Sequence, residues 1–473
     1  MNLPSSFIDR TKELLGELEW TNFVNSLEEK QPVSVRINTK KANAYNFKLA
    51  LENANPIPWC PSGFYLEKRP TFTFDPLFHA GMYYVQEASS MFIGEILRQY
   101  LPEDEALVAL DLCAAPGGKT TLLKSYLPPK SLLIANEIIN KRAQILSENM
   151  QKWGDPDIMV TNNKSEHFTP FKSLFDLILA DVPCSGEGMF RKDETAIEEW
   201  SVENVNTCWK RQREIIENIW SSLKPGGLLI YSTCTYNKEE NEDNIQWIIN
   251  EFGAESLPVE IDSTWGVLQG FSSTNPSYRF IPHRTKGEGF FVAILRKPGQ
   301  WTPNKSTETK DKKKSKSKEK GFSISDFGNY QEWINDTLNY SPIVSGENLY
   351  LFPTQYLPIL TEMKKAKIHF MHIGLPLAYL KGKSVFPYHA LALSKLLNKN
   401  AFEHVDVDYP TAISYLRKEA VTLPATTSKG FILLTYRNIP LGFVKNIGNR
   451  SNNLYPQEWR IRSQYTPENL QLL

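Results

Sequence analysis

Short apolar runs alternate with helical patterns through the middle of the chain. The runs have the length and composition of buried parallel strands, and they lie at 107–112, 132–136, 158–161, 177–180 and 228–232. A helical pattern at 86–101 precedes the first run, and others lie between the runs. This alternation predicts an α/β fold with a doubly wound parallel sheet and right-handed crossovers.

The pattern changes on both sides of this region. The first 75 residues mix helical patterns with one short strand at 33–38, and an amphipathic helix is expected within residues 1–20. The last hundred residues have an α+β pattern, with strands at 431–436 and 441–445. We therefore predict three domains and one linker, at 1–75, 76–297, 298–321 (the linker) and 322–473.

The predicted linker is strongly basic. Residues 305–320 hold eight lysines against three acids, Glu308, Asp311 and Glu319, which gives a local net charge of +5. Such a segment cannot bury enough apolar surface to fold, so it is expected to be flexible. A solvated linker and a tether that attracts phosphate are both compatible with this composition.

The overall composition excludes several protein classes. The formal net charge is zero, so there is no global basic field. No apolar run approaches the ~18 residues of a membrane span, and the N-terminus lacks a signal peptide core, so a cytoplasmic protein is expected. The five cysteines show no C-x-x-C spacing and are odd in number, which predicts reduced thiols and no metal site: Cys60, Cys113, Cys184, Cys208 and Cys234.

Two of these cysteines directly follow predicted strands. Cys184 lies in the run DVPCSG, next to Asp181, and Cys234 lies in STCT. Ligands of open α/β sheets bind at the carboxyl ends of the strands, so two thiols beside an acid suggest covalent catalysis. The residues alone hardly favour either of the two thiols for the role of nucleophile. Small buried hydrophobic residues are the alternative interpretation of both.

The first strand runs into a loop of small residues. Such a loop lets the backbone approach a ligand, and the following helix offers free N–H groups. The spacing is neither that of a dinucleotide fingerprint nor that of a P-loop, and a tight turn without a ligand is the alternative. We expect the loop to bind a cofactor through Cys113, Ala114, Ala115, Pro116, Gly117, Gly118 and Lys119.

Two further polar residues follow the next strands. Glu137, at the end of the second strand, is placed to accept hydrogen bonds from ribose hydroxyls. Asn163, after the third strand, could bind an adenine edge, although an ordinary Asx turn explains it equally well.

Four motifs together resemble the Sun-type RNA cytosine-C5 methyltransferases, and most closely the F type that acts on bacterial 16S ribosomal RNA. They are DLCAAPGGKT (111–120), DVPCSGEGMFRKD (181–193), KPGGLLIYSTCTYNKEENE (224–242) and RFIPHRTKGEGFFVAILRK (279–297). The resemblance implies a class I methyltransferase domain with a Rossmann-like sheet, a small N-terminal α+β RNA-binding domain and a PUA-like C-terminal RNA-binding region. It also implies S-adenosyl-L-methionine as cofactor. The implied partner is RNA, in ribosomal RNA or the small ribosomal subunit, bound by a monomer that contacts no membrane.

The resemblance also assigns roles to individual residues. Cys234 would be the nucleophile, and Cys184 would assist product release. Asp181 would orient the cytosine and lie near the methionine moiety of the cofactor, and Lys119 would point toward the target base. Asn163 departs from the family, where many members have Asp. Five residues could line an entrance for the base, although ordinary packing is the preferred interpretation of each one: Tyr83, Tyr84, Phe190, Arg191 and Lys192. Four others could contact RNA, although a structural role explains His283 equally well: Arg36, Asn38, Arg279 and His283.

Two alternatives to this function remain. The same reaction could act on transfer RNA, which mapping of methylated cytosines would reveal. An inactive scaffold that binds RNA during ribosome assembly would not need S-adenosylmethionine, so calorimetry of cofactor binding would identify it.

Overall fold

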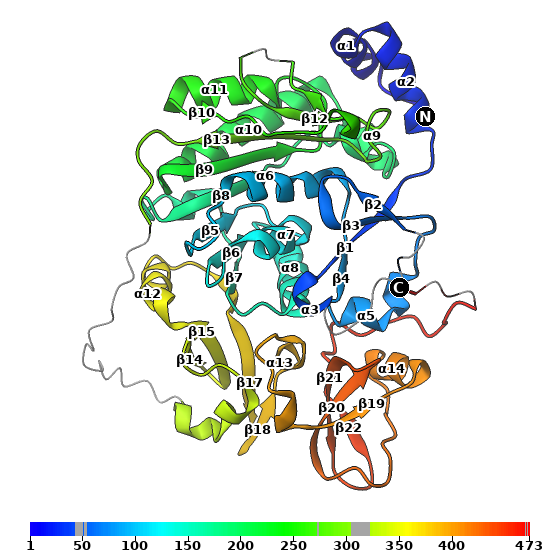
Figure 1. The fold of residues 1–473 in the computed structure, drawn as a ribbon, viewed down its shortest axis with the longest axis vertical. Coiled ribbons are helices and arrows are strands. Elements are labelled where there is room, and N and C mark those ends of the chain that lie inside the picture. The colour runs from blue at the N-terminus through cyan, green and yellow to red at the C-terminus, as the bar shows by residue number, and fades with distance from the viewer. Residues whose placement is uncertain (43–50, 52–53, 272–273, 304–321, 469, 471) are drawn as a thin grey trace.

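The computed structural model describes residues 1–42, 51, 54–271, 274–303, 322–468, 470 and 472–473 (Figure 1). The basic segment 305–320 of the predicted linker lies outside the described residues. In the part of the chain that is described, no helix combines the length and apolar character needed to cross a bilayer.

A ten-stranded sheet forms the centre of the molecule, in the order β11-β12-β13-β9-β8-β5-β6-β7-β16, with β10 paired to β13. Its parallel strands confirm the predicted doubly wound fold and are β5 (Val108–Asp111), β6 (Leu132–Asn136), β7 (Ile158–Thr161), β8 (Phe175–Asp181) and β9 (Leu223–Thr233). The chain order reverses between β5 and β8, which is where such folds bind ligands. Antiparallel strands extend the β9 side, namely β10 (Glu255–Ser256), β11 (Leu268–Gln269), β12 (Tyr278–Phe280) and β13 (Phe290–Arg296).

Helices cover both faces of this sheet because alternate strand residues point to opposite sides. Ala109 of β5 packs into one hydrophobic cluster and Leu110 into the other. The first cluster includes residues of α6 (Ile93–Tyr100), α7 (Gly118–Tyr126) and α8 (Asn140–Trp153). The second includes residues of α10 (Val202–Trp220), α11 (Glu242–Phe252) and α12 (Leu357–Lys365). The predicted helix at 86–101 becomes helical only from Ser89, and α6 itself starts at Ile93.

The N-terminal part contains two helices and a small sheet. The predicted single helix within residues 1–20 is divided at Gly16 (φ +80°) into α1 (Ser5–Leu15) and α2 (Glu17–Leu27). The sheet has the order β2-β3-β1-β4. Its strand β4 lies beyond residue 75, so this sheet extends past the predicted domain boundary. The elements are β1 (Val33–Ile37), α3 (Thr39–Ala42), β2 (Asn55–Ile57), β3 (Cys60–Leu66), α5 (Pro76–His79) and β4 (Tyr83–Val85).

The C-terminal part holds two four-stranded sheets. The first contains β14 (Tyr340–Ser345), β15 (Asn348–Pro353), β17 (Leu375–Lys381) and β18 (Ser384–Pro387). The second contains β19 (Glu403–Asp406), β20 (Gly430–Tyr436), β21 (Ile439–Asn446) and β22 (Ser451–Asn453). Short helices α13 (His389–Leu393) and α14 (Tyr409–Leu416) accompany them, and α9 (Glu194–Glu199) belongs to the central domain.

The C-terminal part packs directly against both other parts (Figure 1). Its strand β16 (Phe370–Ile373) pairs antiparallel with β7 and thereby forms one edge of the central sheet. Its second sheet shares a hydrophobic cluster with the N-terminal sheet, in which Leu434 and Leu441 join Val35 and Leu77. The three parts therefore share continuous packing.

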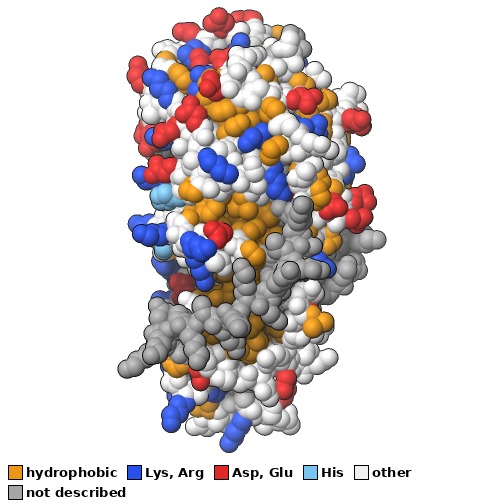
Figure 2. Space-filling model, turned by 90° about the vertical axis from the view of Figure 1, so that its left-hand side faces the viewer, with side chains coloured by type: hydrophobic (Ala, Val, Ile, Leu, Met, Phe, Trp, Pro, Cys, Tyr) orange, Lys and Arg blue, Asp and Glu red, His pale blue; other side chains and the backbone are white. Residues whose placement is uncertain are grey.

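Charged side chains of both signs are mixed on the surface. On the face shown in Figure 2, acidic and basic groups are interspersed in the upper part and hydrophobic side chains gather across the middle. This agrees with the formal net charge of zero. Charge on this face does not single out one nucleic-acid surface.

Candidate active site

The two predicted thiols meet at the carboxyl edge of the central sheet. Cys184 and Cys234 follow the adjacent parallel strands β8 and β9, whose register places Asp181 beside Ser232. The two Sγ atoms lie 3.2 Å apart, and both cysteines are free thiols. Their predicted juxtaposition is thus confirmed.

A cavity of about 380 Å³ opens beside these thiols. Its walls include Cys234, Lys119 and Asp181, together with Pro116 and Gly118 of the small-residue loop. Cys184 is not part of the lining, but its Sγ atom lies 3.2 Å from that of Cys234, which is. This volume lies in the range of small-molecule sites.

A lysine–aspartate pair lies across the cavity from Cys234. Lys119, in the first turn of α7, places Nζ 2.8 Å from Asp181 Oδ2, and Ser232 Oγ donates to Asp181 Oδ1 at 2.8 Å. Burial by itself would lower the pKa of Lys119, but the Asp181 carboxylate and then the nearby Cys234 raise it above its ordinary value. Lys119 is therefore a fixed positive charge, which favours a thiolate nearby.

The contact between the two thiols makes them unequal. The hydrogen bond to Cys234, followed by burial, raises the pKa of Cys184 well above its ordinary value. Cys184 therefore keeps its proton, and its S–H can donate to the sulfur of Cys234. Of the two thiols that the sequence left nearly tied, Cys234 lines the cavity together with Lys119 and Cys184 does not, and the choice of nucleophile stays a prediction.

The small-residue loop owes its shape to Gly117. Its φ of +114° lies in the region that favours glycine, and it caps the start of α7. A Cβ atom at this position would lie 2.6 Å from Cε of Met150, so the end of that methionine side chain would have to move. A glycine is required here to bring the loop against the cavity.

Hydrogen bonds from outside hold the same loop in place. The carbonyl of Pro116 accepts from Asn149 Nδ2 at 2.8 Å and from Tyr84 Oη at 3.1 Å. The carbonyl of Ala115 accepts from Arg142 Nη2 at 2.8 Å. Because Tyr84 belongs to β4, the N-terminal sheet helps to position the loop.

Asp111, at the end of β5, was not among the predicted site residues. It is fully buried, and its Oδ2 accepts from Thr120 Oγ1 at 2.6 Å. Its Oδ1 has no partner among the described residues. Burial raises the pKa of Asp111 to about 7. An unpartnered carboxylate oxygen beside a loop of small residues fits a ligand with hydrogen-bond donors, such as an amino-acid moiety, and an acid ending a strand just before such a loop was the available signal.

The other two predicted cofactor residues are already engaged within the protein. Glu137 Oε1 accepts from the N–H of Ile139 at 2.9 Å, and its Oε2 lies 3.4 Å from Arg142 Nη1. Asn163 donates from Nδ2 to the carbonyl of His369 at 3.0 Å and accepts at Oδ1 from its N–H at 3.1 Å. Both polar atoms of Asn163 thus hold the C-terminal part, and its contact with adenine stays a prediction.

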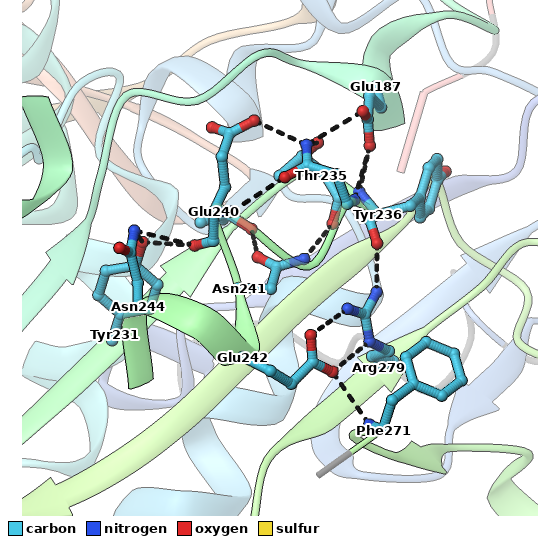
Figure 3. Close-up of polar contacts among 12 residues, drawn as sticks. Glu187, Tyr231, Thr235, Tyr236, Glu240, Asn241, Glu242, Asn244, Phe271 and Arg279 are labelled. Atoms are coloured by element: carbon cyan, nitrogen blue, oxygen red, sulfur yellow. Dashed lines mark hydrogen bonds and ion pairs between the residues drawn. The ribbon is translucent and has the colours of Figure 1, made fainter. Parts of the chain in front are cut away.

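Two buried glutamates brace the loops that carry the cysteines (Figure 3). Glu240 accepts from the N–H of Ser185 at 3.0 Å and from Gln212 Nε2 at 2.6 Å. Glu187 accepts from the N–H of Tyr236 at 2.5 Å. Each loop is therefore fixed by an acid from the other one. Neither glutamate was predicted, although both lie in the quoted motifs.

Arg279 also belongs to this network and not to an RNA surface (Figure 3). It is 1% exposed, pairs with Glu242 (Nε to Oε1, 2.7 Å) and donates from Nη1 to the carbonyl of Tyr236 at 2.6 Å. The expectation that Arg279 contacts RNA is therefore wrong. The same correction applies to Arg36 and Asn38, which are 0% and 1% exposed. The guanidinium of Arg36 and the side-chain N–H group of Asn38 donate hydrogen bonds to neighbouring segments of the protein.

The predicted entrance is only partly formed by the expected side chains. Tyr84 and Lys192 line the cavity. Tyr83 and Phe190 are buried in hydrophobic clusters, and Arg191 is paired with Glu288 at 2.9 Å. Likewise, His283 lies 2.6 Å from Glu19 of α2 and fastens that helix.

Known protein families match most of the chain. The family described as 16S rRNA methyltransferase RsmB/F matches residues 99–296. The N-terminal domain of 16S rRNA methyltransferase RsmF matches residues 3–88, and the RsmF PUA domain matches residues 402–461. These matches correspond to the N-terminal part, the central domain and the second C-terminal sheet.

Individual relatives extend the similarity to nearly the whole length. The ribosomal RNA small subunit methyltransferase F of Citrobacter koseri is 31% identical, over 96% of this chain and 96% of its own. That of Shewanella loihica is 30% identical, over 97% and 95%. A methyltransferase homologue from Pyrococcus horikoshii of known structure is 28% identical, with a TM-score of 0.50, over 62% of this chain and 100% of its own. The chain therefore belongs to the RsmB/F family of 16S rRNA methyltransferases.

Proposed function

We propose that this methyltransferase methylates carbon 5 of one cytosine in 16S ribosomal RNA through a transient bond between Cys234 and carbon 6. One observation carries the proposal. Cys234 lies on the cavity wall with Lys119, and its sulfur contacts the proton-bearing thiol of Cys184 at 3.2 Å. The names of the relatives favour ribosomal RNA over transfer RNA as substrate.

The reaction needs a nucleophile because carbon 5 of cytosine is unreactive. Addition of the Cys234 thiolate to carbon 6 converts the ring to an enamine, whose carbon 5 can then attack a methyl group. S-adenosyl-L-methionine, when bound, supplies that methyl group as an electrophile. The carbon 5 proton then passes to solvent water, the carbon–sulfur bond breaks, and the sulfur of Cys234 leaves with the bonding electron pair.

The remaining residues orient the base and aid departure of the sulfur. Asp181, held by Lys119 and Ser232, is placed to accept a hydrogen bond from the exocyclic amine, and the ammonium of Lys119 is placed to stabilise the negative charge that develops on the ring. The S–H of Cys184 can donate to the sulfur of Cys234 as the carbon–sulfur bond breaks. Residues 113–119, with Asp111 behind them, would hold the cofactor. In this proposal the protein acts as a monomer in the cytoplasm, and its substrate is ribosomal RNA, either free or in the small ribosomal subunit.

Substitution of each cysteine tests the assignment. Cys234→Ala should abolish methylation and leave cofactor affinity nearly intact. Cys184→Ala should slow release of the product, so that a covalent protein–RNA adduct survives denaturation and shifts on a gel. The opposite pair of phenotypes would overturn the roles.

The substrate is tested by mapping. Mass spectrometry of RNA from a deletion strain should show a single cytosine in 16S ribosomal RNA that loses its methyl group. Loss of the methyl group from a transfer RNA instead would identify the alternative substrate, and no loss in any RNA together with no calorimetric binding of S-adenosylmethionine would identify a scaffold.

A further inference from the structure

A second cavity, of about 900 Å³, lies outside the catalytic site. One wall is the outer face of α8, including Ser147 and Gln151, and the others come from the C-terminal part, including Tyr379 of β17 and Trp459 in the segment after β22. We call this space the aromatic groove. In Figure 1, α8, β17 and α13 converge at its location.

Aromatic rings dominate the walls of the aromatic groove. Tyr350, Tyr379, Tyr388 and Trp459 line it, and all four are half-buried, so part of each side chain remains open to a ligand. Tyr379 stacks on Phe386 of the neighbouring strand at 5.5 Å between centroids, with 21° between ring planes. Accessible rings held in a rigid sheet are the usual platform on which unpaired bases stack.

A polar atom without a partner points to the kind of ligand. His389 lines the aromatic groove and is 6% exposed, and its Nε2 has no hydrogen-bond partner in the described part of the chain. Burial, and then the charge of Lys152, lowers the pKa of His389 to about 3, so the imidazole is neutral at pH 7. A neutral ring nitrogen beside Trp459 (5.4 Å between centroids) suits the edge of a base better than it suits a phosphate.

Cations flank the rings. Lys141, Lys418 and Arg462 line the aromatic groove, against the acids Glu148 and Glu458. Glu148 is already paired with Lys152 at 2.5 Å. The remaining positive charge complements a nucleic-acid backbone, which is what a groove that stacks bases requires.

Helix α8 separates the aromatic groove from the catalytic cavity. Asn149 of this helix donates to Pro116 and to Tyr84, which line the catalytic cavity. Ser147 and Gln151, on the other side of the helix, line the aromatic groove. One strand of RNA that leaves the catalytic cavity across α8 would therefore reach the groove.

We propose that the aromatic groove binds an unpaired nucleotide of the substrate RNA, with its base stacked on Tyr379 or Trp459 and its edge bound by Nε2 of His389. The inference rests on the proposed function, because it takes RNA as the substrate. Tyr379 and His389 lie between the family matches at 99–296 and 402–461, whereas Ser147 and Trp459 lie within them, so the groove is not contained in any one matched region.

Binding of a labelled, unstructured RNA of about 12 nucleotides, longer than one stacking platform, tests the groove by fluorescence anisotropy. Tyr379→Ala and Trp459→Ala should each weaken binding about tenfold, the equivalent of about 1.4 kcal/mol. Tyr379→Phe keeps the ring and should bind as the wild type does. The matched control is Tyr465→Ala, which removes a tyrosine that is 67% exposed and lies outside the groove lining.

Methyl transfer to ribosomal RNA separates this inference from the proposed function. Tyr379→Ala should raise KM for RNA with kcat unchanged, whereas Cys234→Ala should bind the labelled RNA normally. Unchanged RNA affinity in folded Tyr379→Ala and Trp459→Ala overturns the groove and points to a protein as its occupant. Groove-dependent binding by a wild type that transfers no methyl group supports the groove and overturns the proposed function.

Discussion

At the scale of single residues, the surroundings of a thiol decide its chemistry. Cys184 and Cys234 both follow buried strands, yet Cys234 lines the cavity and Cys184 does not. The pKa of Cys184 is raised by its hydrogen bond to Cys234 and by burial. Lys119 supplies a positive charge on the other side. The proposed nucleophile, Cys234, thus has one neighbour that holds a proton and another that holds a positive charge.

Lys119→Met tests that charge. The thiolate would lose its nearby cation and Asp181 its ion pair at 2.8 Å, so kcat/KM should fall about 100-fold, in the range for removal of one electrostatic stabiliser. The ascending limb of the pH–rate profile should move to higher pH, because the thiolate becomes harder to form. Lys164→Met, which changes a lysine with 63% side-chain exposure, is the control and should leave both quantities unchanged. An unshifted profile in Lys119→Met would remove Lys119 from the mechanism.

At the scale of elements, the segment between β9 and α11 is held by a strand that is distant in sequence. Arg279 of β12 bridges Glu242, the first residue of α11, and the carbonyl of Tyr236. Removal of one member of a buried ion pair leaves the other charge unpaired. Arg279 therefore supports the cysteine loop after β9 from one side, in addition to the contact that Glu187 makes with the N–H of Tyr236.

Arg279→Met should lower the free energy of unfolding by about 3–5 kcal/mol, measured by urea denaturation, because Glu242 stays buried without its partner. The double variant Arg279→Met with Glu242→Gln should recover part of that loss. KM for RNA should stay the same in the folded fraction. A stable Arg279→Met with a raised KM would show instead that Arg279 contacts RNA.

At the scale of the whole molecule, buried histidines lie where the parts meet. His79 Nδ1 lies 3.1 Å from the hydroxyl of Tyr455, and His372 Nδ1 lies 2.8 Å from Ser147 Oγ of α8. Burial, the largest cause, lowers the pKa of His79 and His389 to about 3 and that of His372 to about 4. These imidazoles are neutral in the folded protein, and those of His79 and His372 connect the C-terminal part to the rest.

Acid should therefore destabilise this packing. Below pH 6.5 the unfolded chain protonates these histidines and the folded protein does not, so stability falls as the pH drops from 6.5 toward about 4. Each of these histidines should lower the free energy of unfolding by about 2 kcal/mol as the pH falls from 7.5 to 5. Asp111, whose pKa is raised to about 7, acts in the opposite direction by a similar amount.

The contribution of one histidine can be isolated by thermal unfolding at these two pH values. His372→Gln should show a pH-dependent loss that is about 2 kcal/mol smaller than in the wild type. His167→Gln, at a histidine with 50% side-chain exposure, should match the wild type. An equal pH dependence in all three proteins would contradict the neutral state of His372.

The local pattern of the chain determined the parts that depend on neighbours in sequence. The apolar pattern was enough to predict the five parallel strands, because strands that are buried on both faces have near-continuous apolar runs. The small-residue loop ending at Gly117 and the two cysteines each directly follow a strand, so their arrival at one sheet edge followed from the topology of such folds.

Tertiary structure alone decided contacts between distant segments. The 3.2 Å approach of two sulfur atoms, the engagement of Asn163 by His369 at 206 positions' separation, and the insertion of β16 beside β7 have no local signal. The burial of Arg279 also has no local signal. From the sequence this arginine was a candidate for contact with RNA, but in the structure it pairs with Glu242. Local periodicity reports which face of an element is apolar, whereas the partner of a polar group depends on which elements the whole fold brings together.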